Sequence, residues 1–555
     1  MIRPSERAIA LIALLLVALA LRLAPWGQNR FLEDEALYAY WGLQIATGAD
    51  PMLDQEPVDK PPLHPYTLAF SFLLFASPPW ARGIEKGHET AARLPSLLAS
   101  MVSIALVYAL GRDLFGDVRV GLLAAFLLAL SPFDILFAST AFTDPLMTAL
   151  VLAALLAAIR GWLGAAGILS GLAAATKQQA LLFLPLVVAI GLLSARLPKS
   201  SRLPKPETSA PFHPPISDIQ SLISRLWGHP WVRFALGFTL VAGGVFWWDS
   251  ARVQRPGFFK QGLISYGGLG PAQPEALDER AGEWLRLAGD FWVSPWFNAL
   301  LLGALAAWVI GSIRSVTLSE AKSLPFRIGK ILRFAHAPRD ISRWVPIPGL
   351  LSLSKVDLAL GAFIACFLVL HWLVGFQVWD RYLLGLVPLA ALLAARAFVA
   401  LGRAIRSAPW RRIYAAGLGL ALVLSLVGPV AKAARSELPL GGDHGAYGGI
   451  DALAAYVRTR VPPGAVLYHY WLGYHYRFYL YGAPLRLHWY PDLADLTHDA
   501  YVYRREPRYI AFPSWRDSTP EMEALASAGI RLVPVFETTR RDGTISFRLY
   551  KLEGP

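Results

Sequence analysis

The feature that most constrains this chain is a long series of apolar segments. A bilayer core about 30 Å thick takes about 20 mostly apolar residues in a helix. Of the 555 residues, 55% are hydrophobic and only 16% are charged, a balance that compact water-soluble cores do not accommodate. We therefore predict a polytopic α-helical membrane protein with about 11 spans, near residues 8–24, 94–111, 119–138, 145–160, 162–176, 179–195, 234–250, 292–312, 356–375, 383–400 and 413–431.

The first apolar segment follows Arg3 and Arg7, as the core of a signal peptide also would. A cleaved signal peptide is the alternative to a first span. We interpret the segment as an uncleaved span, because further spans follow it and because the chain directly after it carries the best chemical motif.

The distribution of basic residues predicts the orientation. Cytoplasmic loops carry an excess of Lys and Arg. A cytoplasmic N-terminus places the basic loops at about 196–233 and 313–355 inside, provided that the short, proline-edged apolar run 63–76 does not cross the membrane. We predict that this run and segment 34–47 are interfacial helices of a first outer loop, about residues 25–93. The net charge of +13 then belongs to these loops, and no nucleic-acid motif is present.

The chain changes character after the last span. Short apolar runs at 465–468, 508–512 and 545–550 alternate with helical patterns at 449–460 and 520–528. Strands that alternate with helices indicate a small α/β domain. We predict a transmembrane catalytic domain over residues 1–431 and an extracytoplasmic α/β domain over residues 432–555.

Three consecutive carboxylates, Glu33, Asp34 and Glu35, follow the first span. Carboxylates this close raise one another's pKa, which suits acid–base chemistry. A solvated loop, or acidic residues at the start of the next helix, is the alternative. Asp59 and Lys60 lie further along the same loop.

Other candidate residues lie at the outer ends of spans. Asp144 stands in a Thr-Asp-Pro sequence, which also starts helices. Lys177 and Arg381 oppose the positive-inside trend and so indicate an anionic partner such as a phosphate. The alternatives are snorkelling side chains and a local pair between Asp380 and Arg381. Arg93 is a further cation on this side.

Several expected signals are missing from the sequence. The centres of the spans carry almost no ionisable residue, His371 being the nearest exception, whereas ion-coupled transporters place charge near the midplane. The single cysteine, Cys366, excludes an intramolecular disulfide. No His/Asp spacing in the outer loops indicates a closed metal site. Three histidines of the tail lie among Tyr and Trp residues, in a sugar-contacting surface or in a packed core: His469, His475 and His488.

Taken together, the motifs resemble those of the GT-C glycosyltransferases of the protein O-mannosyltransferase and lipid A aminoarabinose transferase (ArnT) type. The matching motifs are Asp34-Glu35 with Tyr38-Ala39, Lys60 to Leu63, Ala92 to Ser96, Gly111 to Gly116, Ser131-Pro132, Asp144, Gly171 to Ala173, Thr176-Lys177, and Arg381-Tyr382 near Pro388. Their order and spacing fit through about residue 195 and again near residues 380–398.

The resemblance implies a polyprenyl-phosphate sugar as donor and a catalytic acidic residue at Asp34. It maps the family's lysine onto Lys60 and its second aspartate onto Asp144. It also implies a bacterial or archaeal plasma membrane, since the large outer mid-chain domain of eukaryotic mannosyltransferases is missing. Leu37 stands where aminoarabinose transferases tend to carry arginine. Residues 249–291 contain no histidine, so the zinc site of some relatives is not expected; metal dependence stays open.

The sequence thus predicts an inverting glycosyltransferase that acts on the extracytoplasmic face. Its acceptor, a hydroxyl or phosphate of a glycan, lipid or protein, is left open, and so is the sugar. A transporter or flippase for a lipid-linked sugar and a non-catalytic assembly protein are the alternatives. We assign catalysis to Asp34, Glu35 and Asp144, donor phosphate binding to Lys60, Arg381 and Lys177, and further substrate contacts to Tyr38, Asp59, Arg93 and Tyr382.

Overall fold

The computed structural model describes residues 4–76, 86–195, 229–252, 256–266, 268, 270–323 and 353–554. Most of the two basic loops predicted at 196–233 and 313–355 lies outside these ranges.

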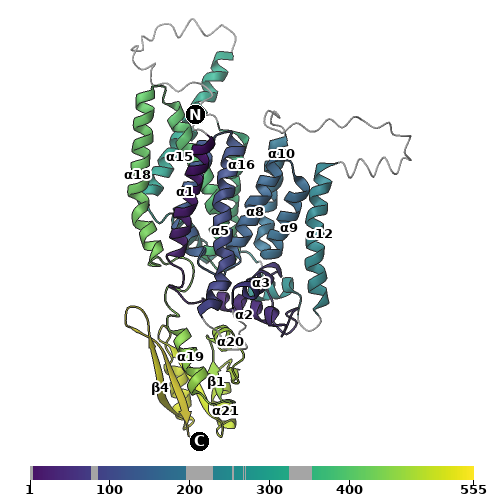
Figure 1. Cartoon of the computed structure of the whole chain (residues 1–555), viewed down its shortest axis with the longest axis vertical. Helices are drawn as coiled ribbons and strands as arrows, with labels where there is room; N and C mark the ends of the chain where they lie inside the picture. Colours follow the sequence, from purple (N-terminus) through teal and green to yellow (C-terminus); the bar gives the residue numbers. More distant parts are fainter. Residues whose placement is uncertain are drawn as a thin grey trace, which may run out of the picture.

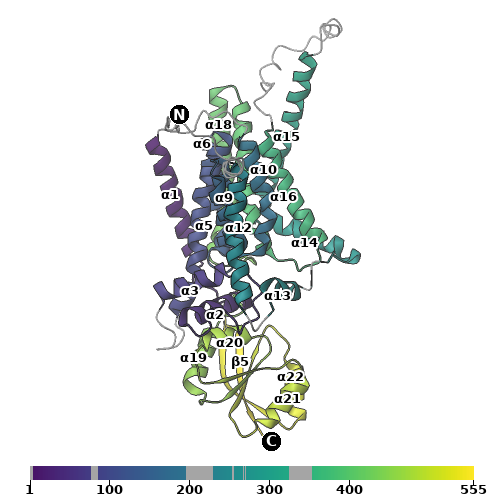
Figure 2. The ribbon, with the colours of Figure 1, turned by 90° about the vertical axis from the view of Figure 1, so that its right-hand side faces the viewer.

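Every predicted span is helical, and the helices form an elongated bundle (Figures 1 and 2). Among the described residues, six helices are by themselves long and apolar enough to cross a membrane, and five apolar helices are shorter. Some spans are broken in two, because a proline or a short 3-10 turn interrupts the α-helix. The helices at the predicted spans are α1 (Pro4–Leu23), α5 (Lys86–Phe115), α6 (Val118–Ala129) with α7 (Pro132–Phe137), α8 (Asp144–Ile159), α9 (Leu163–Thr176), η1 (Gln178–Phe183) with α10 (Leu184–Ala195), α12 (Pro230–Ala251), α15 (Pro295–Ser323), α16 (Lys355–Leu373), η5 (Asp380–Leu386) with α17 (Val387–Ala404), and α18 (Ala408–Ala434).

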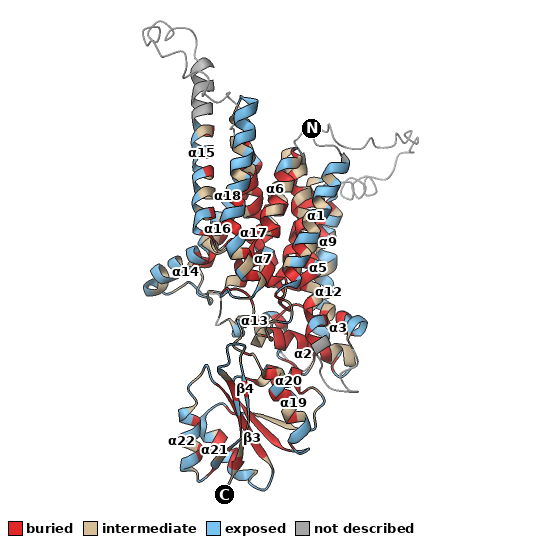
Figure 3. Ribbon diagram, turned by 60° about the vertical axis from the view of Figure 1, so that its left-hand side comes forward, coloured by how far each residue is buried: buried red, intermediate tan, exposed pale blue. Residues whose placement is uncertain are grey.

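The outer surface of the bundle is apolar. Leu240 on α12, Leu302 on α15 and Leu424 on α18 are each about two-thirds exposed or more, while α17 is largely buried (Figure 3). Large aliphatic side chains exposed in this number are incompatible with water and suit lipid. The chain is a polytopic helical membrane protein, as predicted.

Short helices close one end of the bundle. They are α2 (Glu33–Thr47), α3 (Leu63–Phe75), α13 (Phe258–Ser265), η2 (Pro274–Ala276) and α14 (Leu277–Gly289). Helix α2 begins where Glu35 accepts a hydrogen bond from the Leu32 amide, and it ends at Gly48. Gly48 has a φ of +72°, a conformation that glycine adopts without strain because it has no Cβ. The predicted helices 34–47 and 63–76 are thus present; their place at a membrane surface stays a prediction.

The C-terminal region is an α/β unit with a five-stranded sheet of order β2-β1-β3-β5-β4. Strands β1, β2 and β3 are parallel, whereas β3, β5 and β4 pair antiparallel. This confirms the α/β character predicted for the tail; the boundary at residue 431 stays a prediction. The elements are α19 (Ile450–Arg460), β1 (Val466–His469), α20 (Gly473–Tyr479), β2 (Arg486–Trp489), α21 (Leu493–Val502), β3 (Arg508–Pro513), α22 (Thr519–Ser527), β4 (Arg531–Thr539) and β5 (Ile545–Glu553).

Polar contacts hold the C-terminal unit against the segment between α1 and α5. Helix α20 lies between the sheet and α2 (Figures 1 and 2). His475 on α20 binds the Phe31 carbonyl at 2.8 Å, and Arg477 lies 3.0 Å from Glu56. His475 and His469 are buried, so of the two expectations for these histidines the packed core is correct and the sugar-contacting surface is wrong.

Candidate active site

Asp34 and Arg381 meet at the end of the bundle although 347 residues separate them. Asp34 lies in the first turn of α2, and Arg381 lies in η5. The Arg381 Nη1 to Asp34 Oδ2 distance is 2.5 Å. Burial opposes ionisation of Asp34, but the charges of Arg381 and Lys60 outweigh it and lower the pKa of this carboxyl. Asp34 is therefore a carboxylate at neutral pH.

Two lysines complete a group of cations around this pair. Lys60 binds Asp59 at 2.5 Å and lies 4.9 Å from the centre of the Tyr266 ring. Lys177 binds Asp144 at 2.6 Å. Both charges of the second pair are almost completely buried.

The position of Lys177 follows from a break in the chain. Helix α9 ends at Thr176, and Lys177 takes an extended conformation before η1 begins. Burial lowers the pKa of Lys177 to about 8, and the neighbouring cations Arg381 and Lys60 act in the same direction, while Asp144 opposes them. Lys177 is still mainly charged at neutral pH.

The site has capacity for an anion. Each of the three cations has one carboxylate partner and retains further N–H donors. The Arg381 Nε is buried and has no hydrogen-bond partner among the described residues. An unsatisfied buried donor is unfavourable by about 1–3 kcal/mol, so it favours a ligand that accepts a hydrogen bond from it.

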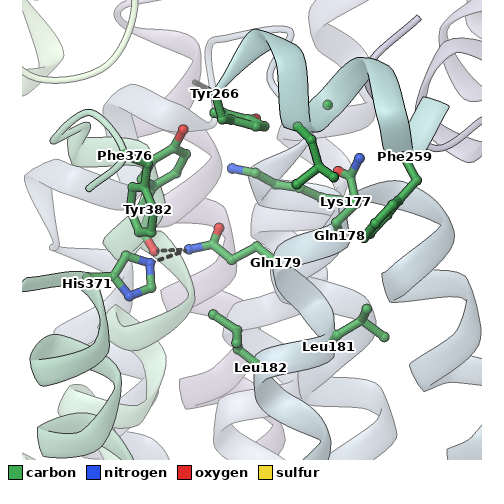
Figure 4. Close-up of a pocket in the computed structure, with 12 residues that line it drawn as sticks. Lys177, Gln178, Gln179, Leu181, Leu182, Phe259, Tyr266, His371, Phe376 and Tyr382 are labelled. Carbon is green, nitrogen blue, oxygen red and sulfur yellow. Dashed lines mark hydrogen bonds between the residues drawn. The ribbon is translucent and has the colours of Figure 1, made fainter. Parts of the chain in front are cut away.

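A cavity of about 280 Å³ opens beside one of these cations, Lys177 (Figure 4). Lys177 reaches into it near Tyr266, and Gln179 binds the Tyr382 carbonyl at 3.0 Å and His371 at 3.1 Å. The rest of its wall is mainly apolar. The lining residues are Lys177, Gln178, Gln179, Leu181, Leu182, Phe259, Gly262, Leu263, Tyr266, His371, Phe376 and Tyr382.

A second cavity, of about 260 Å³, is lined by Arg381 and is more polar. It is bounded by Phe142, Trp379, Asp380 and His444, among others. The carboxylate of Asp380 accepts hydrogen bonds from the backbone amides of Arg381 at 2.7 Å and Gly441 at 2.9 Å. The guanidinium of Arg381 binds Asp34 instead, so the local pair of adjacent side chains is not formed.

Two of the predicted site residues lie apart from the three cations. Glu35 is fully buried and accepts hydrogen bonds from the Leu32 amide at 3.0 Å and the Ala141 amide at 2.8 Å. Burial raises its pKa to about 7, against the opposing charge of Arg93, whose Nε is 3.9 Å away. Glu35 thus joins the start of α2 to the chain before α8. Arg93 also pairs with Glu89 at 3.4 Å.

The remaining predicted contacts lie close to Asp34 or to the cations. Tyr38 is one turn after Asp34, and its ring lies 5.6 Å from that of His64. Burial raises the pKa of Tyr38, and the charge of Asp34 adds to this effect. Tyr382 lies with its ring 4.5 Å from Lys177 Nζ.

The sequence did not indicate Tyr266, Gln178 or Gln179. Tyr266 follows the short helix α13, in a segment without a recognisable motif. Gln178 binds the Asp59 carbonyl at 2.8 Å and so links the end of α9 to the Lys60 loop. The two adjacent glutamines interrupt an apolar stretch after Lys177, and this interruption is the sequence signal that could have identified them as site residues.

Comparisons with known proteins agree with this architecture. Residues 59–209 match the family described as dolichyl-phosphate-mannose-protein mannosyltransferase. No curated protein sequence matches the chain. The structure of ArnT from Cupriavidus metallidurans in the apo state aligns with a TM-score of 0.59 at 16% identity, covering 99% of both chains. The structure of ArnT from the same organism bound to undecaprenyl phosphate aligns with a TM-score of 0.57 at 16% identity, covering 99% of this chain and 98% of that one. These findings confirm the resemblance seen in the motifs: the chain is a multi-pass membrane protein that shares its fold with the ArnT structures, and its residues 59–209 match the mannosyltransferase family model.

Proposed function

We propose that this protein transfers a sugar from a polyprenyl-phosphate donor to an acceptor hydroxyl or phosphate. One observation carries the proposal. Three cations from distant segments, Lys60, Lys177 and Arg381, gather around the carboxylate Asp34 beside a largely apolar cavity. A phosphate joined to an isoprenoid chain matches both halves of this site.

The cations bind the donor phosphate, and the cavity holds the first isoprene units of its lipid chain. Phosphate oxygens accept charge-assisted hydrogen bonds from Lys and Arg, which are among the strongest in proteins. The unpartnered Nε of Arg381 supplies one further donor. Undecaprenyl phosphate in the ArnT structure of the same fold supports this class of donor.

Asp34 acts as the general base toward an acceptor hydroxyl. The acceptor oxygen attacks the anomeric carbon, its proton passes to Asp34, and the bond from that carbon to the phosphate oxygen breaks. The lipid phosphate leaves without needing a proton, because Lys60, Lys177 and Arg381 match its charge. A single direct displacement inverts the anomeric configuration. A positioned base contributes roughly 10²–10⁴ in rate.

The donor also releases Asp34 for this role. In the structure Arg381 occupies one carboxylate oxygen of Asp34 at 2.5 Å. A phosphate that draws the guanidinium toward itself weakens this contact and makes Asp34 a better proton acceptor. Asp144 then positions Lys177, and Glu35 positions the turn that carries Asp34.

The site faces the extracytoplasmic side in this proposal. The candidate site and the C-terminal unit lie at one end of the bundle, and the N-terminus of the chain lies at the other (Figure 1). Helix α10 ends and α12 begins at the N-terminal end of the bundle (Figure 1). The basic stretch of sequence between these two helices is of the kind that the positive-inside rule assigns to the cytoplasm.

The test uses purified full-length protein and a panel of radiolabelled polyprenyl-phosphate sugars. Wild type should cleave or transfer from at least one donor, and Asp34→Asn should lose this activity while it still binds undecaprenyl phosphate. Equal activity in Asp34→Asn would refute the assignment of the base. If neither protein uses any donor, and both move lipid-linked sugar across liposomes equally well, the chain is a transporter instead.

A further inference from the structure

The C-terminal sheet directs the carboxyl ends of its parallel strands toward the membrane bundle. Strand β1 pairs in parallel with β2 and β3. From the end of β1 the chain passes through residues 470–472 into α20, and α20 packs against α2 (Figures 1 and 2). In open α/β sheets, ligands bind outside the carboxyl ends of parallel strands. Here that edge lies on the side of Asp34.

Aromatic residues are exposed at this edge. Tyr470 and Trp471 follow β1, and Trp515 and Arg516 follow β3; we call these four residues the aromatic edge. Trp471 is 45% exposed and Trp515 is 39% exposed. The centres of the Tyr470 and Trp471 rings are 5.0 Å apart. The Arg516 guanidinium lies 4.9 Å from the centre of the Tyr470 ring and 5.4 Å from that of Trp471.

Contacts beneath the aromatic edge hold it in place. Arg516 binds the buried carboxylate of Glu521 at 2.8 Å. The Trp515 ring packs against Tyr447 at 5.8 Å, and the Tyr447 hydroxyl donates a hydrogen bond to Glu33, which precedes Asp34. Rings that are already fixed lose little conformational entropy when a ligand binds.

Tyr474 extends this surface toward the candidate active site. It lies three residues after Trp471, on α20. Burial raises the pKa of Tyr474; the charge of Arg477 opposes this, and the carboxylates of Asp34 and Asp59 add to it. Tyr474 is 36% exposed, and α20 packs against α2, the helix that carries Asp34, so Tyr474 lies between the aromatic edge and that helix.

We propose that the aromatic edge binds saccharide rings of the acceptor. The inference rests on the proposed function and specifies its second substrate as a glycan. The negative faces of aromatic rings attract the weakly positive C–H groups on one face of a sugar, while Arg516 and the Tyr470 hydroxyl meet its oxygens. Trp and Tyr are also common where proteins meet lipid headgroups. The link from Trp515 through Tyr447 to Glu33 favours the glycan.

The test measures sugar binding independently of turnover. Full-length protein in lipid nanodiscs is titrated with maltotetraose, chitotetraose and mannotetraose, and binding is followed by saturation-transfer NMR. The variants are Trp471→Ala and Trp515→Ala, with Tyr501→Ala as the matched control, since Tyr501 is 51% exposed on α21 of the same unit. Binding of undecaprenyl phosphate checks that each protein is folded.

The expected result is that wild type and Tyr501→Ala bind at least one tetrasaccharide, and that both Trp variants bind it at least tenfold more weakly. The proposal is overturned if no tetrasaccharide binds, or if the Trp variants bind like wild type. It is also overturned if hydrogen exchange shows residues 470–474 and 514–516 protected by lipid, because the edge is then a membrane contact. Sugar binding without any donor turnover would refute the proposed function alone, and turnover without sugar binding would refute this inference alone.

Discussion

The buried pair of Lys177 and Asp144 leads to a quantitative prediction about stability. Two unit charges whose nearest atoms are 2.6 Å apart attract each other by about 6 kcal/mol at an effective dielectric constant of about 20. Desolvation of both groups offsets most of this gain. Removing one partner of a buried pair typically costs about 3–5 kcal/mol, because the other charge stays buried. We expect Asp144→Ala to lower the free energy of unfolding by about this amount.

The double variant Asp144→Ala/Lys177→Met separates stability from function. It removes both charges and should recover most of the lost stability. It should not recover transfer, because Lys177 no longer binds the donor phosphate. Unfolding is followed by circular dichroism in an SDS titration at pH 7, and transfer is followed with the radiolabelled donor. If Asp144→Ala unfolds at the same SDS concentration as wild type, or if the double variant regains transfer, the reasoning is wrong.

Three further predictions concern the donor site. Arg381→Lys removes the planar guanidinium group that faces both Asp34 and the phosphate. It should weaken the binding of undecaprenyl phosphate roughly tenfold or more, measured by equilibrium binding. Unchanged affinity would exclude a contact between Arg381 and the phosphate. Because the pKa of Lys177 is about 8, donor affinity should fall as pH rises through about 8, and Lys177→Arg should remove this limb. The same lowered pKa means that the unfolded chain binds more protons between about pH 8 and 10.5, so this lysine's contribution to the unfolding free energy should rise with pH over that range. Gly262→Val should fill part of the cavity, because a Cβ at this position would lie 3.3 Å from the Asp59 carbonyl and 3.5 Å from Gln178, and it should therefore raise the Kd for undecaprenyl phosphate. The control is Gly282→Val, at a helical position with open space around it. Equal affinity in the two variants would contradict the placement of the lipid.

The sequence determined the elements of this protein because their signals are local. Apolar length predicted the helices of the bundle, six of which are long and apolar enough to cross a membrane, and proline-edged or amphipathic segments predicted α2 and α3. Alternating short patterns predicted the α/β tail. Motif order also brought Asp34, Lys60 and Arg381 into one hypothesis, although no local pattern can show that side chains 347 residues apart will touch.

Only the tertiary structure decided how the side chains are distributed around the site. Glu35 is adjacent to Asp34 in the chain, yet successive helical residues point in different directions, so it reaches the Ala141 amide while Asp34 reaches Arg381. Tyr266 enters the site because α13 folds back over the Lys60 loop. The exposed Trp471 and the buried His469 are two residues apart and have the same kind of neighbours in sequence. Helix α20 covers His469, whose ring lies 5.8 Å from that of Tyr476, and leaves Trp471 exposed, because burial depends on how the chain folds back and not on the neighbours in sequence.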